Sequence, residues 1–224
     1  MPCAKPASAS SAFNKARMYT PKFNQVGDRA TLIEAMRAYS FAILFGPFSC
    51  QEATEPPAAT HLPLVVEDKG EHGTLVGHFA RANRHWQALA GRETLVVFQG
   101  PHSYVSPTLY AGPLSVPTWN YIAIHAYGTL ELVDDEPGKE ALLKNLIEVH
   151  EPTYAEKWHH LPEGYRRTML AGITGFRIPI ARIEGKFKLS QNRSETDRRR
   201  VRAAHAAGTP DQQSLAEWMA RLSS

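Results

Sequence analysis

The sequence predicts an α+β fold, mainly β, in which an antiparallel barrel carries peripheral helices and a helical C-terminus. The first observation is a series of about six β-like segments between residues 41 and 189, most of them short. The second is that helical patterns lie between these segments and after the last of them. The third is that the sequence contains no internal repeat. Its hydrophobic residues, 43% of the chain, suffice for a substantial core. This succession of strands and helices favours a barrel of antiparallel strands.

The first elements are a capped helix and a short strand. Asp28 is placed to cap a helix that carries apolar residues at helical spacing, namely Leu32, Ile33 and Met36. The apolar run 41–45 is too short for a separate helix and predicts a buried strand. Residues 51–57 are rich in Pro, Glu and Ala, which predicts an exposed loop.

A hairpin, a short helix and another strand are expected next. Residues 58–66 and 74–80 predict two strands joined around residues 68–70. Asn83 then caps a short helix that runs to about residue 89. Residues 94–100 predict a strand that ends at the Gly-Pro corner of residues 100 and 101.

The rest of the chain alternates between strand and helix. A long β-rich segment contains Gly128, which predicts a bulge or a bend. Either Asp134 or Asp135 opens the helix that follows. The predicted elements, in order, are a strand over 118–133, helices over 137–150 and 163–170, a strand over 173–189, and two helices within 195–222, separated by 208–210.

Composition indicates an ordinary globular protein. The formal net charge is +3, and the cysteines, Cys3 and Cys50, have no metal-ligand spacing. No run approaches the roughly 18 to 20 apolar residues of a membrane span, and the N-terminus lacks the apolar region of a signal peptide. We therefore expect a cytoplasmic protein with no membrane partner and no metal. Three parts are predicted: a disordered leader over 1–17, a barrel domain over 18–193 and a basic helical extension over 194–224.

Arg81 occupies a position that suits an anion. A strand ends here and a helix begins at Asn83, so a guanidinium and backbone N–H groups are expected at one turn. Charge and helix N-terminal donors together favour a phosphate. An exposed arginine beside an ordinary helix cap explains these residues equally well.

Two further clusters have either a binding or a packing role. Residues 99–107 gather polar side chains at a Gly-Pro corner, where glycine allows a ligand to approach closely. The alternative is a polar turn with Tyr104 over the core. In residues 119–121, alternation places Trp119 and Tyr121 on one face and Asn120 on the other. The two rings either flank a planar heterocycle or pack in a subunit interface.

The basic residues of the chain are concentrated near the C-terminus. From residue 186 to 202 there are seven Lys or Arg against two acids, a balance of +5, so the rest of the chain sums to 3 − 5 = −2. Such a segment faces an anion or only water. The arginines at 198, 199, 200 and 202 fall on the expected helix, which makes them candidates for contact with a nucleic acid backbone.

Familiar catalytic motifs are absent, and we predict no catalytic residue. The sequence has no Gly-x-Ser-x-Gly, no Walker loop, no Gly-x-Gly-x-x-Gly and no His-Glu-x-x-His. Four histidines lie in β-like segments (His61, His78, His102 and His125) but are too widely spaced for a local metal motif. Flavin chemistry needs none of these motifs, because the isoalloxazine carries the electrons.

Several blocks taken together closely resemble the family of PaiB-type, FMN-binding negative transcriptional regulators. They occur in family order over about residues 18 to 200, at 18–22, 59–63, 77–83, 98–102 with 106–107, 116–121, 125–128 and 182–193. Any single block is weak, whereas the ordered set is specific. The resemblance implies an FMN-binding split β-barrel that forms a homodimer with FMN across its interface.

The resemblance also implies which residues meet FMN. Thr60, His61 and Leu62 match a strand that faces the cofactor, and the segment from His78 to Asn83 matches a phosphate-binding strand end with Arg81 as the cation. The full set of expected cofactor-binding residues is Thr60, His61, Leu62, His78, Ala80, Arg81, Asn83, Gln99, His102, Ser106, Trp119, Asn120, Tyr121, Lys188 and Gln191.

Two functions follow from this resemblance, and the alternative to both is a dimeric split-barrel protein that binds flavin weakly or not at all. The first is a homodimeric negative transcriptional regulator that contacts DNA through Arg198, Arg199, Arg200 and Arg202. The alternative is an FMN-dependent oxidoreductase, such as a flavin reductase, or an enzyme of the haem-degrading type. Fold analogy alone does not decide between them.

Overall fold

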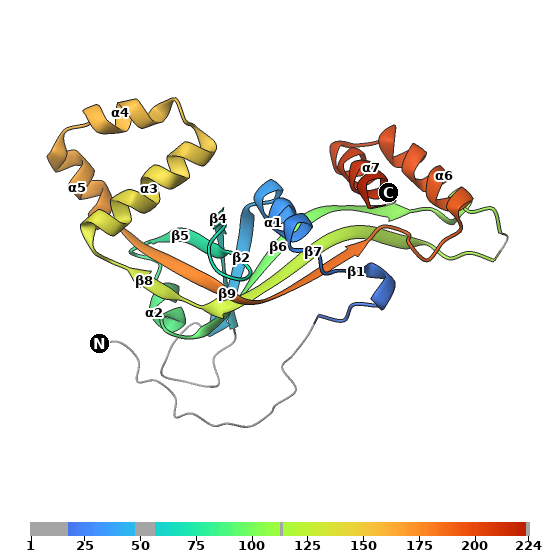
Figure 1. The fold of residues 1–224 in the computed structure, drawn as a ribbon, viewed down its shortest axis with the longest axis horizontal. Helices are drawn as coiled ribbons and strands as arrows, with labels where there is room; N and C mark the ends of the chain where they lie inside the picture. Colours follow the sequence, from blue (N-terminus) through green and yellow to red (C-terminus); the bar gives the residue numbers. More distant parts are fainter. Residues whose placement is uncertain (1–17, 48–56, 113, 223–224) are drawn as a thin grey trace, which may run out of the picture. The chain divides into compact units, whose positions relative to one another are not determined.

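The computed structural model describes residues 18–47, 57–112 and 114–222 of the chain. These residues form a nine-stranded, mostly antiparallel sheet with seven α-helices and two short 3-10 helices (Figure 1). The prediction of an α+β, mainly β fold is confirmed, although the strands do not close into a complete barrel. The predicted leader and most of the predicted exposed loop lie outside the described residues.

The strands follow the order β3-β2-β6-β7-β9-β5-β4, and β1 and β8 also pair with β9. Antiparallel pairing joins β2 to β3 and β6, β4 to β5, and β5, β1 and β8 to β9. The bounds are β1 (Gln25–Val26), β2 (Phe41–Pro47), β3 (Pro57–Pro63), β4 (Val65–Glu67), β5 (Thr74–Ala80), β6 (Glu93–Val105), β7 (Thr118–Thr129), β8 (Glu131–Val133) and β9 (Ile173–Lys188).

The described chain divides into two compact units. Unit 1 comprises residues 33–98 and 125–183, and unit 2 comprises residues 18–32, 99–124 and 184–222. Strands β6, β7 and β9 each contribute residues to both units. The boundary expected at residues 193 and 194 stays a prediction.

Unit 1 contains a helical excursion between β8 and β9. It consists of α3 (Glu136–His150), α4 (Tyr154–His160) and α5 (Glu163–Ala171), and Figure 1 shows the three helices grouped together. Asp135 caps α3 by accepting a hydrogen bond from Gly138 N at 2.8 Å. Ion pairs of 3.3 Å from Glu136 to Arg167 and 3.2 Å from Glu140 to Arg166 hold α3 against α5. The sequence predicted α3 and α5 but not α4.

Unit 2 contains the two C-terminal helices, α6 (Glu195–Ala206) and α7 (Pro210–Arg221). The fully buried Phe187 of β9 meets Trp218 of α7 edge to face, with ring centroids 5.3 Å apart. Ser103 of β6 accepts a hydrogen bond from Gln212 of α7 at 2.9 Å. Helix α7 begins with a capping box at Thr209, as the break at 208–210 predicted.

Helix α1 (Arg29–Ala38) begins as predicted, because Asp28 accepts a hydrogen bond from Thr31 N at 2.8 Å. Near its end, Arg37 donates twice to the Val66 carbonyl of β4, at 3.2 and 3.0 Å. Strand β4 is therefore held by a side chain of α1 as well as by β5.

Three predictions on strands need correction. Strand β6 does not end at the Gly-Pro corner but continues to Val105, because Gly100 and Pro101 are both buried and the alternation shifts by one residue there. The first strand of the predicted hairpin is divided at Leu64, so that β3 pairs with β2 while β4 pairs with β5. Gly128 lies within β7, where a Cβ would stand 2.2 Å from the Pro179 carbonyl oxygen, so close approach of β9 accounts for the glycine.

Candidate functional site

One face of the sheet in unit 2 collects aromatic rings and ammonium groups. Ser103, Asn120 and Phe187 are buried, and two of them contact α7 directly. Side chains alternate along a strand, so the neighbours of these residues lie on the opposite face. We call this set the aromatic–cationic face; its members are His102, Tyr104, Trp119, Tyr121, Lys186 and Lys188.

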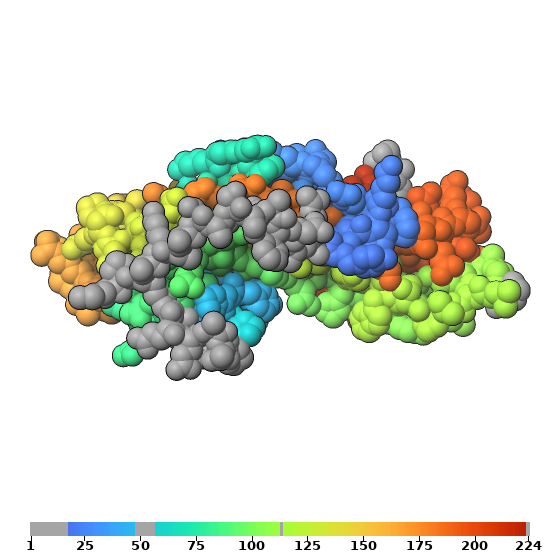
Figure 2. Space-filling model, turned by 90° about the horizontal axis from the view of Figure 1, so that it is seen from below, coloured from blue at the N-terminus to red at the C-terminus, as the bar shows by residue number. Residues whose placement is uncertain are grey.

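The rings of the aromatic–cationic face meet around Trp119, which is 50% exposed. Its ring centroid lies 5.8 Å from that of His102 and 6.3 Å from that of Tyr104. Figure 2 shows the yellow-green segment around residues 114–120 on the surface seen from below. An exposed tryptophan flanked by rings offers a flat apolar platform to a planar ligand.

Two lysines also belong to this face, and one of them, Lys186, is buried. The Lys186 ammonium lies 5.3 Å from the centroids of both Tyr19 and Tyr121, and it donates to the Tyr19 carbonyl at 2.7 Å. The Lys188 ammonium donates to the Thr118 hydroxyl. The face therefore combines ring surfaces with positive charge, which suits an anionic aromatic ligand.

Four other predicted residues of unit 2 are placed differently. Asn120 is fully buried and exchanges hydrogen bonds of 3.1 Å with the Ser190 hydroxyl. Gln191 folds back, accepting from Leu189 N at 2.7 Å. Ser106 caps the 3-10 helix η2 (Pro107–Leu109), and Gln99 is exposed. Their contact with a cofactor stays a prediction.

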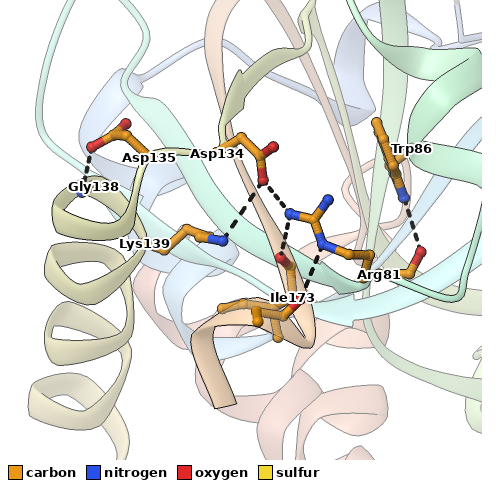
Figure 3. A network of polar contacts seen from close by, with 8 residues as sticks. Arg81, Trp86, Asp134, Asp135, Gly138, Lys139 and Ile173 are labelled. Carbon is orange, nitrogen blue, oxygen red and sulfur yellow. Dashed lines mark hydrogen bonds and ion pairs between the residues drawn. The ribbon is translucent and has the colours of Figure 1, made fainter. Parts of the chain in front are cut away.

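The turn after β5 holds Arg81 in a network of acceptors (Figure 3). Arg81 Nε donates to the Ala171 carbonyl at 3.0 Å, and Nη2 donates to the Ile173 carbonyl at 3.2 Å and to the Asp134 carboxylate. The Lys139 ammonium lies 3.7 Å from the same carboxylate. The structure therefore gives Arg81 a structural role without burying it, since 41% of its side chain is exposed.

The backbone N–H groups expected beside Arg81 are engaged within the protein. Arg81 N donates to the Gly172 carbonyl at 2.8 Å and Asn83 N donates to the Ala80 carbonyl at 2.9 Å. The following helix α2 (His85–Leu89) has only five residues, and its first N–H donates to the Asn83 side chain at 3.1 Å. An anion at this turn therefore depends on the Arg81 guanidinium.

A second polar cluster joins β3 to this turn and includes a residue that the sequence did not predict. His85 is buried, and its Nδ1 lies 2.8 Å from the Thr60 hydroxyl. Asn83 Nδ2 donates to the same hydroxyl at 3.3 Å. Burial lowers the pKa of His85, so the imidazole is held neutral. The burial of His85 was not predicted from the sequence, because the residue directly follows the charged Arg84.

The remaining predicted residues of unit 1 do not all lie on the same face of the sheet. His61 is exposed and stacks on Phe41 at 6.1 Å, and Leu62 is half-buried beside it on β3. His78 alternates with Phe79, which packs against His85, so His78 points to the other face of β5. Burial lowers the pKa of His78. Ala80 is exposed at the end of β5.

The C-terminal arginines lie on α6 as predicted. Arg199, Arg200 and Arg202 are exposed, whereas Arg198 is half-buried. The Arg199 guanidinium lies 3.9 Å from the Glu195 carboxylate one turn earlier. Helix α6 therefore presents a basic surface, although one of its charges is paired.

Among the described residues, no helix is long and apolar enough to cross a membrane, and no group of three or more His, Cys, Asp or Glu is placed to hold a metal ion. Cys3 and Cys50 lie outside the described residues.

The open antiparallel sheet with peripheral helices has the architecture of the flavin-binding split-barrel group. Solved structures show the same fold. The flavocytochrome Anf3 of Azotobacter vinelandii matches with a TM-score of 0.57 at 17% identity, over 74% of this chain and 69% of that one. The FAD and heme binding protein of Mycobacterium smegmatis matches with a TM-score of 0.54 at 17% identity, over 83% and 81%.

Sequence comparison identifies the family within that class. The family model described as "Putative FMN-binding domain" matches residues 18–182. The Bacillus subtilis "Protease synthase and sporulation protein PAI 2" is 37% identical over 80% of this chain and 85% of its own length. An uncharacterised protein of Emericella nidulans is 30% identical over 62% of this chain and 71% of its own. The chain belongs to this FMN-binding, PaiB-like family, its cofactor is FMN, and the resemblance seen in the sequence is confirmed.

The residues present fit FMN. The cofactor carries a flat three-ring system and a phosphate, and the aromatic–cationic face offers rings beside ammonium groups. The exposed guanidinium of Arg81 suits a phosphate, because its planar fork matches phosphate oxygens.

Proposed function

We propose that FMN binds across the interface of a homodimer, with the isoalloxazine at the aromatic–cationic face of one protomer and the phosphate at Arg81 of the partner subunit. The observation that carries the ring site is the half-exposed Trp119 between His102 and Tyr104. Lys188, whose ammonium donates to the Thr118 hydroxyl, is proposed to supply a cation. FMN, when bound, supplies one- and two-electron transfer chemistry, while the protein supplies position and hydrogen bonds. Thr60 and Asn83, which share a hydrogen bond, are proposed as further contacts, and contact of FMN with the remaining predicted residues of unit 1 stays a prediction.

Titration of the flavin-free protein with FMN, followed by flavin fluorescence, tests the ring site. Trp119→Leu is expected to raise the Kd for FMN about two- to tenfold, because a stacked aromatic contributes about 0.5–1.5 kcal/mol beyond area burial. The control is Tyr165→Leu, which changes a similarly exposed ring (52%) on α5. Equal affinities in both variants and the wild type would refute this site.

We also propose that unit 2 forms a homodimer interface. Large apolar side chains are exposed in it: Leu114 is 96% exposed, Val116 69% and Phe23 51%. Leu114 and Val116 lie two residues apart, and exposed apolar side chains that form a contiguous patch mark a protein interface. Leu114→Asp combined with Val116→Asp is expected to shift the sedimentation coefficient from dimer to monomer.

The control for the dimer uses the same change on unit 1. Val149→Asp combined with Met169→Asp alters side chains that are 56% and 40% exposed on α3 and α5. It is expected to leave the dimer intact. A monomeric wild type, or dimers in both variants, would contradict the proposed interface.

The exposed arginines of α6 favour a regulatory function, and we propose that the protein is a negative transcriptional regulator that binds DNA in the cytoplasm. A relative whose name refers to protease synthesis and sporulation is consistent with that role. Arg200 and Arg202 are exposed on one helix, and each phosphate contact of a cation adds to the salt dependence of binding.

Fluorescence anisotropy with promoter and unrelated duplexes over a salt series tests this function. Arg200→Glu with Arg202→Glu is expected to weaken binding to both duplexes and to leave FMN affinity unchanged. It should also reduce the slope of log K against log salt by about 2 for each protomer that contacts the DNA. Arg84→Glu with Lys157→Glu is the charge-matched control. Equal affinity of the wild type for promoter and unrelated DNA would overturn sequence-specific regulation.

A further inference from the structure

Arg81 joins both ends of the helical excursion of unit 1. Asp134 directly precedes the N-cap of α3, Ala171 is the last residue of α5, and Ile173 is the first residue of β9. The guanidinium donates to all three. One side chain of the β5 turn therefore fastens the entry and the exit of a segment of almost forty residues.

The contacts occupy one edge of the guanidinium and leave the other open. Nε and Nη2 make all the hydrogen bonds that Arg81 forms within residues 18–47, 57–112 and 114–222, and Nη1 makes none there. Figure 3 shows Nη1 pointing away from the three acceptors. Nη1 carries two N–H donors in the plane of the fork. Arg81 is therefore held in place with a pair of donors available to an anion.

The local charge also favours an anion at Nη1. Asp134 is shared by Arg81 and by Lys139, whose side chain is only 7% exposed, so these three charges sum to +1. The carboxylate lies on the Nη2 edge. A phosphate at Nη1 would approach the cations from the side away from Asp134.

We propose that Arg81 couples the phosphate of the bound flavin to the α3–α5 excursion, with Asp134 as the residue that positions it. A phosphate at Nη1 restrains the guanidinium in the orientation that fastens both ends of the excursion. In return, Asp134 and the two carbonyls present Nη1 to the phosphate, since coupling between two sites is reciprocal. This inference rests on the proposed FMN site and adds to it a regulated segment, residues 134–173.

Hydrogen exchange with two flavins provides the test, because riboflavin has the same ring system as FMN but no phosphate. FMN is expected to slow amide exchange at residues 134–142 and 166–175 about threefold or more relative to riboflavin, each at saturation. Arg81→Lys keeps the charge but lacks the fork, so it should lose this difference between the flavins.

Asp134→Ala separates positioning from simple charge. Loss of positioning raises the Kd for FMN about tenfold and leaves that for riboflavin unchanged. If Asp134 acted only as a nearby negative charge, its removal would instead tighten FMN. Asp134→Asn keeps an acceptor and should lie between Asp134→Ala and the wild type. Asp211→Ala, which removes an acid at the start of α7, is the charge-matched control.

The outcomes distinguish this inference from the proposed function. If both flavins bind and protect residues 134–142 and 166–175 equally, or if Asp134→Ala tightens FMN, the coupling is overturned while flavin binding stands. If neither flavin quenches or shifts its fluorescence with the protein, the proposed flavin site fails together with the coupling.

Discussion

Replacement of Trp218 by alanine should release α7 from the sheet. Trp218 is 5% exposed and packs edge to face on the fully buried Phe187, with an interplanar angle of 80°. A tryptophan buries about 200 Å², which at about 25 cal/mol per Å² corresponds to an upper value of about 5 kcal/mol. Truncation of a buried aromatic ring commonly costs about 3–5 kcal/mol. We expect the free energy of unfolding to fall by about 3–5 kcal/mol.

Urea unfolding followed by far-UV circular dichroism measures this loss. A double-mutant cycle with Phe187→Leu should give a coupling of about 0.5–1.5 kcal/mol for the edge-to-face pair. The control is Arg221→Ala, since that guanidinium lies 4.6 Å above the Trp218 ring and its removal should cost only about 0.5–1 kcal/mol. A loss below about 2 kcal/mol for Trp218→Ala, or a coupling of zero, would show that the ring does not anchor α7.

Three other predictions concern the sheet and α6. Gly128→Ala should lower the free energy of unfolding by about 3 kcal/mol or more, because the new Cβ would lie 2.2 Å from a carbonyl oxygen of β9. Gly27→Ala is the control in thermal unfolding. A Cβ at Gly27 would have nothing within 4 Å, so this change should be near neutral. Asn120→Ala should lower the free energy of unfolding in urea by about 1–3 kcal/mol, since it leaves the buried Ser190 hydroxyl without its partner. An unchanged free energy of unfolding would show that water replaces the amide. Burial lowers the pKa of His205 in the folded state, so the unfolded state binds more protons and stability falls as pH drops below about 6.5. His205→Gln should flatten that dependence, and an unchanged slope of the urea midpoint against pH would count against it.

Local sequence patterns predicted most of the helices and strands. Asp28 and the Thr209 turn define helix starts through contacts within three residues, which a sequence displays directly. Helix α4 has only Trp158 buried, so no apolar periodicity marked it. The continuation of β6 through Gly100 and Pro101 depends on strand pairing and burial, which the local pattern does not reveal.

The candidate site depended more on contacts between distant parts of the chain. Alternation correctly separated Trp119 and Tyr121 from the buried Asn120, because the period of a strand is a local property. Lys186 was noted only as part of the basic segment 186–202, since its contact with the Tyr19 carbonyl spans 167 positions in sequence. The engagement of Arg81 by Asp134 spans 53 positions and was equally hidden.

The contact of Arg37 with β4 has a consequence for behaviour at high concentration. A strand at the end of a sheet can recruit a strand from another molecule through its free carbonyl and N–H groups, and such recruitment begins aggregation. The Val66 carbonyl already accepts two N–H groups from Arg37. That oxygen is not available to an incoming strand, and the charged guanidinium meets any such strand first. Arg37 thus protects this edge of the sheet from intermolecular pairing.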